Sequence, residues 1–174
     1  MSLTVPVSAD DHMQGPAAAP LTLVEYGDYE CPYCGAAYPL VKAIVKRLGP
    51  KLRFVFRNMP LKQMHPNAEL AAEAAEAAAT QGKFWEMHDA LYEHQSELGA
   101  DLVRKLAQRL SLDAPQFESD LVSRKYRERV KRDFMSGVRS GVAGTPTFFI
   151  NGERYDGELD EQSLTAALQQ KIPH

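Results

Sequence analysis

The hydrophobic positions of this chain change between strand-like and helix-like spacing. Two short apolar runs, at 21–27 and 52–57, are typical of buried strands. Between them, apolar residues recur at helical spacing, at Tyr38, Val41, Ile44, Val45 and Leu48. A strand, a helix and a second strand in this order predict a βαβ unit whose two strands are parallel.

The middle of the chain is helical in pattern. An alanine-rich run at 65–81 and an aromatic run at 84–95 each predict a helix. Three further helices are predicted at 101–110, 113–122 and 126–140. Aspartate is a good N-cap residue. Asp113 is therefore the expected N-cap of the helix at 113–122, and Asp101 or a residue just before it is the expected N-cap of the helix at 101–110.

After Gly141 and Gly144 the pattern becomes strand-like again. The runs 147–150 and 153–155 flank Asn151-Gly152, and this dipeptide is the strongest short signal for a β-hairpin. A last amphipathic helix is then expected, capped by Asp160.

The first twenty residues and the composition set the frame. Residues 1–20 contain three prolines and little apolar patterning, so we expect an extended lead-in. A chain of 174 residues with 44% hydrophobic content is expected to be a monomer with one core. The formal charge of −3 gives no general reason to expect nucleic acid as a partner. No apolar run approaches the ~20 residues that a membrane span needs.

The chain's two cysteines, Cys31 and Cys34, stand where the first strand meets the first helix. A C-x-x-C at such a junction is a thiol–disulfide redox signature. The helix start presents N–H groups and the positive end of its dipole to the first sulfur. We therefore predict that Cys31, at the exposed edge of the helix start, attacks as a thiolate and that Cys34 resolves. Pro32 suits the first helical position.

Acidic residues complicate this chemistry. Glu25, Asp28 and Glu30 lie within six residues of Cys31, and no Lys or Arg is close in sequence. Their negative charge raises the pKa of a nearby thiol, whereas the helix terminus lowers it. Sequence does not rank the two effects, because the distances between the groups are unknown.

Two segments carry a resemblance to a known family: Glu25-Tyr-Gly-Asp-Tyr-Glu-Cys-Pro-Tyr-Cys34 and Gly141-Val-Ala-Gly-Thr-Pro-Thr-Phe148. Together they resemble the DsbA-like branch of the thioredoxin superfamily, and the resemblance extends over 19–170. It implies an α/β thioredoxin fold with an all-helical insertion. In this interpretation 21–59 and 141–174 form the thioredoxin-like part, and 60–140 form the insertion.

The resemblance also implies an activity. Such a protein exchanges disulfides with protein or peptide substrates through a mixed disulfide, and a redox partner recycles the cysteine pair. The exchange needs no cofactor. A cis peptide before Pro146 is implied, facing the cysteines, so that Thr145 can pair with an extended substrate segment. Substrate binding is therefore expected at Pro32, Tyr33, Thr145 and Pro146.

Glu25 has two interpretations. In the resembling family an acidic group at this place lies beneath the cysteine pair and shuttles protons. We hypothesise that Glu25 accepts the Cys34 proton as the mixed disulfide is released. The alternative is that Glu25 lies on a solvated strand edge.

Other functions stay open at this point. The Pro-Tyr dipeptide between the cysteines is also typical of glutaredoxins, so a glutaredoxin-like or thioredoxin-like reductase using a small thiol is one alternative. A non-enzymatic binding module of thioredoxin fold, with the cysteines as a structural clip, is another. Metal is not expected, because a structural zinc site needs four ligands and the five histidines are scattered.

Two further expectations concern surface and compartment. The basic residues between 124 and 132 are expected to form a solvated helix face rather than a nucleic-acid site. Residues 1–20 lack the pattern of a secretory signal, so the sequence as it stands predicts a cytoplasmic protein. A periplasmic location is expected instead if a signal has been trimmed from the N-terminus.

Overall fold

A computed structural model describes residues 1–173, which form a five-stranded sheet and seven α-helices. The strands are β1 (His12–Gln14), β2 (Leu21–Gly27), β3 (Leu52–Asn58), β4 (Thr147–Ile150) and β5 (Glu153–Tyr155). The helices are α1 (Pro32–Leu48), α2 (Ala68–Ala79), α3 (Phe84–Glu93), α4 (Ala100–Arg109), α5 (Ala114–Val122), α6 (Arg127–Arg139) and α7 (Glu161–Gln169). Two 3-10 turns are η1 (Gly49–Lys51) and η2 (Gln95–Glu97).

The sheet has the order β1-β3-β2-β4-β5, which makes β2 its central strand. β2 and β3 are parallel and joined by α1, so the predicted βαβ unit is confirmed. β4 then pairs antiparallel with the other edge of β2. Because β2 has a strand on each side and a layer over each face, all seven of its residues are buried.

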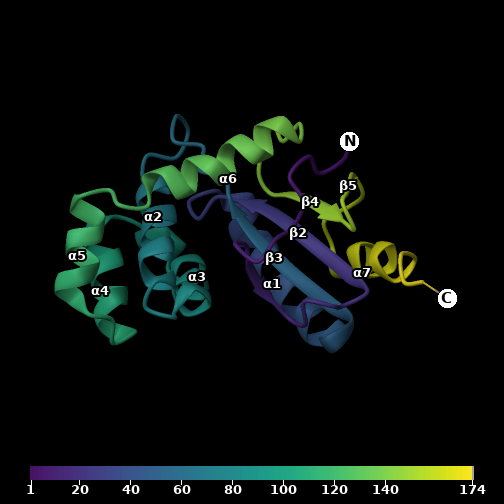
Figure 1. Ribbon diagram of the computed structural model, residues 1–174, viewed down its shortest axis with the longest axis horizontal. Coiled ribbons are helices and arrows are strands. Elements are labelled where there is room, and N and C mark those ends of the chain that lie inside the picture. The colour runs from purple at the N-terminus through teal and green to yellow at the C-terminus, as the bar shows by residue number, and fades with distance from the viewer. Residues whose placement is uncertain (174) are drawn as a thin grey trace.

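Alternation along β2 assigns its side chains to two different cores. Leu21 and Leu23 face a large core that includes residues of α1, α3 and α7. Val24 and Tyr26 face a smaller core, which the lead-in and Phe134 of α6 cover. Figure 1 shows α2 to α5 gathered at one end of the molecule, with α6 crossing back from them toward β4.

The turn and cap signals place most element ends correctly. Asn151 and Gly152 both have positive φ, 49° and 85°, as the tight hairpin between β4 and β5 requires. Asp113 accepts the Gln116 N–H, and Asp160 accepts the Ser163 N–H, so both predicted caps are confirmed. Gly99 rather than Asp101 is the N-cap of α4.

The start of α2 differs from its prediction. The helix begins at Ala68 rather than at 65, because a residue before proline is disfavoured in the helical region and Pro66 follows His65. His65 instead turns its ring toward Asp28, with Nδ1 2.8 Å from a carboxylate oxygen. This contact brings the start of the insertion against the loop that precedes the cysteines.

The lead-in holds more structure than its composition predicts. Its residues His12–Gln14 form β1, which pairs antiparallel with β3 at the edge of the sheet. Three residues are too few to show a strand period, so the sequence did not reveal that part of the extended lead-in pairs with the sheet. An isolated bridge between Ser2 and Glu153 attaches the other end of the lead-in to β5.

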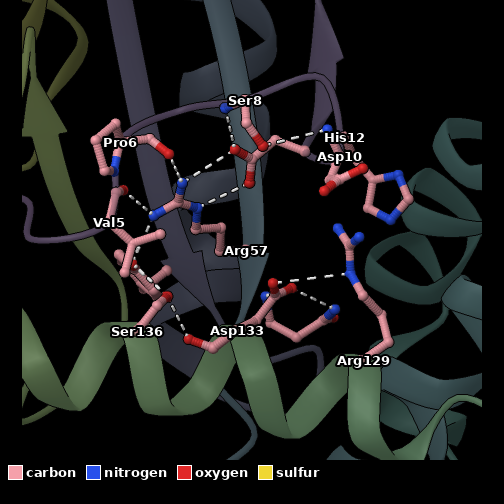
Figure 2. Close-up of polar contacts among 12 residues, drawn as sticks. Val5, Pro6, Ser8, Asp10, His12, Arg57, Arg129, Asp133 and Ser136 are labelled. Carbon is pink, nitrogen blue, oxygen red and sulfur yellow. Dashed lines mark hydrogen bonds and ion pairs between the residues drawn. The ribbon is translucent and has the colours of Figure 1, made fainter.

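Arg57 explains why the lead-in stays on the sheet. This buried side chain donates from Nε and both Nη atoms to the carboxylate of Asp11, the Tyr26 hydroxyl and the carbonyls of Val5 and Pro6. Figure 2 shows these bonds reaching from β3 into the lead-in. All five donors of the guanidinium are used, which is what a buried arginine requires.

The basic residues between 124 and 132 form a solvated face only in part. Arg124 pairs with Glu69 and Glu73 of α2, at 2.8 and 2.7 Å. Arg129 turns toward Glu76 and is 20% exposed. The helical period did not reveal that acidic side chains of α2 face this segment. Among residues 1–173, no helix is both long enough and apolar enough to cross a membrane.

Candidate redox-active site

The cysteine pair lies at the N-terminus of α1, at the end of the central strand. Cys31 is the N-cap residue, Pro32 opens the helix, and Cys34 is buried in the first turn. Both cysteines are free thiols. Cys31 Sγ donates to the Thr145 carbonyl at 3.5 Å, and the Thr145–Pro146 peptide bond is cis, as expected. The structure thus brings together two motifs that lie 114 residues apart.

The exposure of the site differs from its prediction in one respect. Cys31 was expected at an exposed edge, but it is 3% exposed, because the Thr145–Pro146 segment lies against its sulfur. Tyr33, by contrast, is 75% exposed and projects from the first turn of α1, between the two cysteines. Tyr33 is therefore far more accessible from solvent than the sulfur beside it.

The surroundings of Cys31 favour its thiolate. A hydrogen bond from the Cys34 thiol is the largest cause, and together with the Thr145 hydroxyl and the N–H groups of Cys34 and Tyr33 it outweighs burial and lowers the pKa of Cys31 to about 5. The same bond, burial and the charge of Glu25 raise the pKa of Cys34. A stabilised Cys31 thiolate beside a protonated Cys34 suits the predicted division into attacking and resolving thiols.

Glu25 lies in β2 on the same face as Leu21 and Leu23, beneath the cysteines. It is paired with Phe56 of β3 and Phe148 of β4, so the interpretation as a solvated strand edge is wrong. Burial, then the charge of Cys31, raises the pKa of Glu25 to about 8. Its Oε1 atom has no hydrogen-bond partner. A cavity of about 20 Å³ lined by Glu25, His88 and Tyr92 adjoins it, which is room for a single water.

The other two acidic residues do not act on the thiol as their proximity in sequence suggests. Asp28 accepts bonds from the N–H groups of Glu30 and Leu61 and from His65 Nδ1, at 2.8, 2.9 and 2.8 Å. Glu30 accepts the Asn67 N–H at 2.9 Å. Both carboxylates therefore fix the start of the insertion against residues 28–31, which we call the cysteine loop.

One residue beside the cysteines was missed in the sequence. The Gln95 side-chain amide, from η2, donates to the carbonyls of Tyr29 and Cys31, at 2.8 Å each. The sequence signal that could have revealed this contact is Gly35, because a glycine inside a helical pattern often has a packing reason. A Cβ atom at Gly35 would lie 2.3 Å from Gln95 Oε1.

Within residues 1–173, no three or more His, Cys, Asp or Glu side chains are grouped so that they could bind a metal ion. His88, which is buried among aromatic rings, shares a hydrogen bond of 2.9 Å between its Nδ1 atom and the Tyr29 hydroxyl. Burial lowers the pKa of His88 to about 3, so this imidazole is a neutral part of the core.

Comparison with known proteins agrees with the fold and the site. A family model described as Thioredoxin matches residues 8–170, nearly the whole chain. This chain belongs to the thioredoxin family. It is 26% identical to a thioredoxin-like oxidoreductase from Silicibacter pomeroyi, with a TM-score of 0.79 over 94% of this chain and 92% of that one.

The DsbA-like form of the thioredoxin fold is also shown. The protein superposes on alpha-DsbA1 from Wolbachia pipientis with a TM-score of 0.84, covering 98% of this chain and 94% of that one, at 18% identity. The predicted α/β thioredoxin fold with a helical insertion is therefore confirmed. The cysteine pair at its usual place in this fold supports a thiol–disulfide oxidoreductase.

A curated relative shows a different context for the same domain. The chain is 49% identical over 170 residues to a Na(+)/H(+) antiporter, NhaA 3, from Salinispora tropica. The match covers 97% of this chain but 26% of the relative. The chain thus spans about a quarter of the length of the curated relatives it matches, and the antiport that their names describe is not carried over to it.

Proposed function

We propose that this thioredoxin-family protein oxidises dithiols in protein or peptide substrates. A substrate thiolate attacks Cys31 of the Cys31–Cys34 disulfide, the S–S bond breaks, and Cys34 leaves and takes up a proton. A second substrate thiolate then attacks the substrate sulfur of the mixed disulfide and releases Cys31 as a thiolate. Two electrons pass from substrate to protein. A redox partner must remove them before the next cycle.

Glu25 is the proposed proton source and acceptor for Cys34. With its raised pKa, the carboxyl is protonated near neutral pH and can protonate Cys34 as this thiol leaves. In the reverse, reducing direction it accepts the same proton. The backbone of Thr145, beside the Cys31 sulfur, is proposed to pair with the substrate, and Pro32, Tyr33 and Pro146 are proposed to contact it.

The stabilised Cys31 thiolate is the observation that supports oxidation rather than reduction. Interactions that favour the thiolate are lost when the disulfide forms, so they favour the reduced pair and make the disulfide a stronger oxidant. Thioredoxin, which is a reductase, has a nucleophilic thiol with a pKa of about 7. The pKa of Cys31, lowered to about 5, supports the proposal of a pair that is more oxidising than that of thioredoxin.

The reduction potential of the pair tests this proposal. We expect equilibration with glutathione buffers to give a value well above the about −270 mV of thioredoxin, toward the about −120 mV of DsbA. A value near −270 mV would overturn the oxidising direction and favour the small-thiol reductase, whose turnover depends on glutathione. Failure to form the Cys31–Cys34 disulfide would overturn exchange itself and favour the binding module.

A further inference from the structure

Gln95 contacts the backbone on both sides of Glu30, the residue that precedes the nucleophile. Its side-chain amide has two protons, and each is donated to one carbonyl, of Tyr29 and of Cys31. The Cys31 carbonyl also accepts the Gly35 N–H at 3.0 Å, which is the first helical bond of α1. Gln95 therefore fixes the peptide groups at the point where the cysteine loop becomes a helix.

Gly35 supports this reading independently. Its φ is not in the left-handed region, so its backbone conformation does not require glycine. Glycine within a helix costs about 1 kcal/mol relative to alanine. A Cβ atom there would lie 2.3 Å from Oε1, 2.9 Å from Cδ and 3.0 Å from Nε2 of Gln95. The glycine leaves the space that the Gln95 side chain occupies against the first turn.

The first turn is also the part of α1 that stabilises the nucleophile. The Cys34 thiol and the N–H groups of Cys34 and Tyr33 lower the pKa of Cys31, and all of them belong to that turn. Gln95 does not touch the sulfur. It can act on the sulfur through the orientation of the backbone groups around it.

We propose that Gln95 is a positioning residue for the cysteine pair: by holding the Tyr29 and Cys31 carbonyls, it keeps the first turn of α1 aimed at the Cys31 sulfur. This proposal rests on the proposed exchange activity and extends it to the helical insertion. Through this residue the insertion sets the acidity of the nucleophile and the redox equilibrium of the pair. A merely structural contact would stabilise the reduced and oxidised proteins equally and leave both properties unchanged.

The test uses Gln95→Met, which keeps the length of the side chain and removes its donor. In the reduced protein we expect the Cys31 thiolate to titrate at higher pH, with about a three- to tenfold loss of acidity, the effect of a lost hydrogen bond. The equilibrium with glutathione should shift by a similar factor toward the disulfide. Gln108→Met, an exposed change on α4, is the matched control and should change neither quantity.

Gly35→Ala gives the second arm, since it displaces the Gln95 side chain instead of removing it. We expect it to shift the titration in the same direction as Gln95→Met. In a Gln95→Ala background the same Gly35→Ala change should become neutral or stabilising, because the space is then free. If Gln95→Met does not fold, the titration of Gly35→Ala decides.

Two results would separate the possible failures. A folded Gln95→Met protein whose thiolate titration and glutathione equilibrium match those of Gln108→Met overturns the positioning role. A wild-type protein that forms no Cys31–Cys34 disulfide overturns the proposed function instead. The thiolate titration of the reduced protein still measures the Gln95 effect in that case.

Discussion

At the scale of single residues, the chemistry depends on one sulfur, that of Cys31, whose charged form is favoured by groups from two places, the first turn of α1 and Thr145. The Cys34 thiol, the N–H groups of the first turn and the Thr145 hydroxyl all contribute. From their proximity in sequence, the carboxylates of Asp28 and Glu30 were expected to raise the pKa of this thiol. In the structure both accept hydrogen bonds from backbone N–H groups. Neither carboxylate is among the causes that shift the pKa of Cys31.

The titration of Cys31 is the first prediction at this scale. Thiolate absorbance of the reduced protein should have a midpoint near pH 5. Cys34→Ala should raise that midpoint, because it removes the largest stabilising hydrogen bond. Cys31→Ser should leave no thiolate below pH about 8.5, the ordinary thiol value, since the remaining cysteine has a raised pKa. A wild-type midpoint near that ordinary value would contradict this account.

Glu25 is the subject of the second prediction. Glu25→Gln should slow the release of a trapped mixed disulfide by Cys34 roughly 10- to 100-fold, at or below the usual contribution of a general base. The wild-type release rate should show an inflection above the ordinary pKa of a glutamate, because burial raises the pKa of Glu25, and the variant should lose it. Glu86→Gln, an exposed change on α3, is the control. An unchanged pH profile in Glu25→Gln would remove Glu25 from the mechanism.

At the scale of elements, the buried Arg57 holds the lead-in in place, although the lead-in has no strong hydrophobic pattern of its own. Arg57 attaches the lead-in to β3, and β1 then pairs with the same strand. The insertion is attached to the cysteine loop in a similar way, through Asp28, Glu30 and Gln95. Polar contacts thus join segments whose apolar patterns do not predict contact.

Arg57→Met tests the first of these attachments. Losing one partner of a buried ion pair leaves Asp11 uncompensated, and we expect the free energy of unfolding to fall by about 3–5 kcal/mol. Arg53→Met on the same strand should cost about 1 kcal/mol, because Arg53 is less buried and donates to a hydroxyl, of Thr22, and a carbonyl, of Ala17, rather than to a carboxylate. Guanidinium unfolding of both variants measures the difference. Equal losses would show that Arg57 does not hold the lead-in.

At the scale of the whole molecule, two groups of opposite tendency link stability to pH in the reduced protein. The folded pKa of Cys31 lies below its unfolded value of about 8.5, so its stabilisation is present above that pH and is lost as pH falls through about 5. The folded pKa of Glu25 lies above its unfolded value of about 4.3. Its contribution is present below that pH and is lost as pH rises through about 8.

The two contributions should therefore offset each other between pH about 5 and about 8 in the wild type. Relative to the wild type, reduced Cys31→Ser should lose stability as pH rises across this window. Reduced Glu25→Gln should instead gain stability relative to the wild type as pH rises across the same window. Guanidinium unfolding at several pH values gives both differences. Parallel pH curves for the three proteins would show that neither group is shifted on folding.

Most helices and strands could be predicted from sequence because their signals are local. Period-two and period-3.6 patterns, two aspartate caps and an Asn-Gly turn each depend on residues a few positions apart. The lead-in strand could not, because a three-residue strand has no period. The start of α2 did carry a local signal, since Pro66 disfavours a helical His65. The candidate site was predicted in its motifs but not in its electrostatics.

The sequence by itself determined the order of elements, the position of Cys31 and Cys34 at a helix start and the presence of an acid in the preceding strand. Tertiary structure alone decided that this acid is buried, that Thr145 reaches the nucleophile and that Gln95 holds the loop before it. The physical reason is that helix and strand signals come from neighbours in the chain. Desolvation and hydrogen bonding depend on residues that only packing brings together.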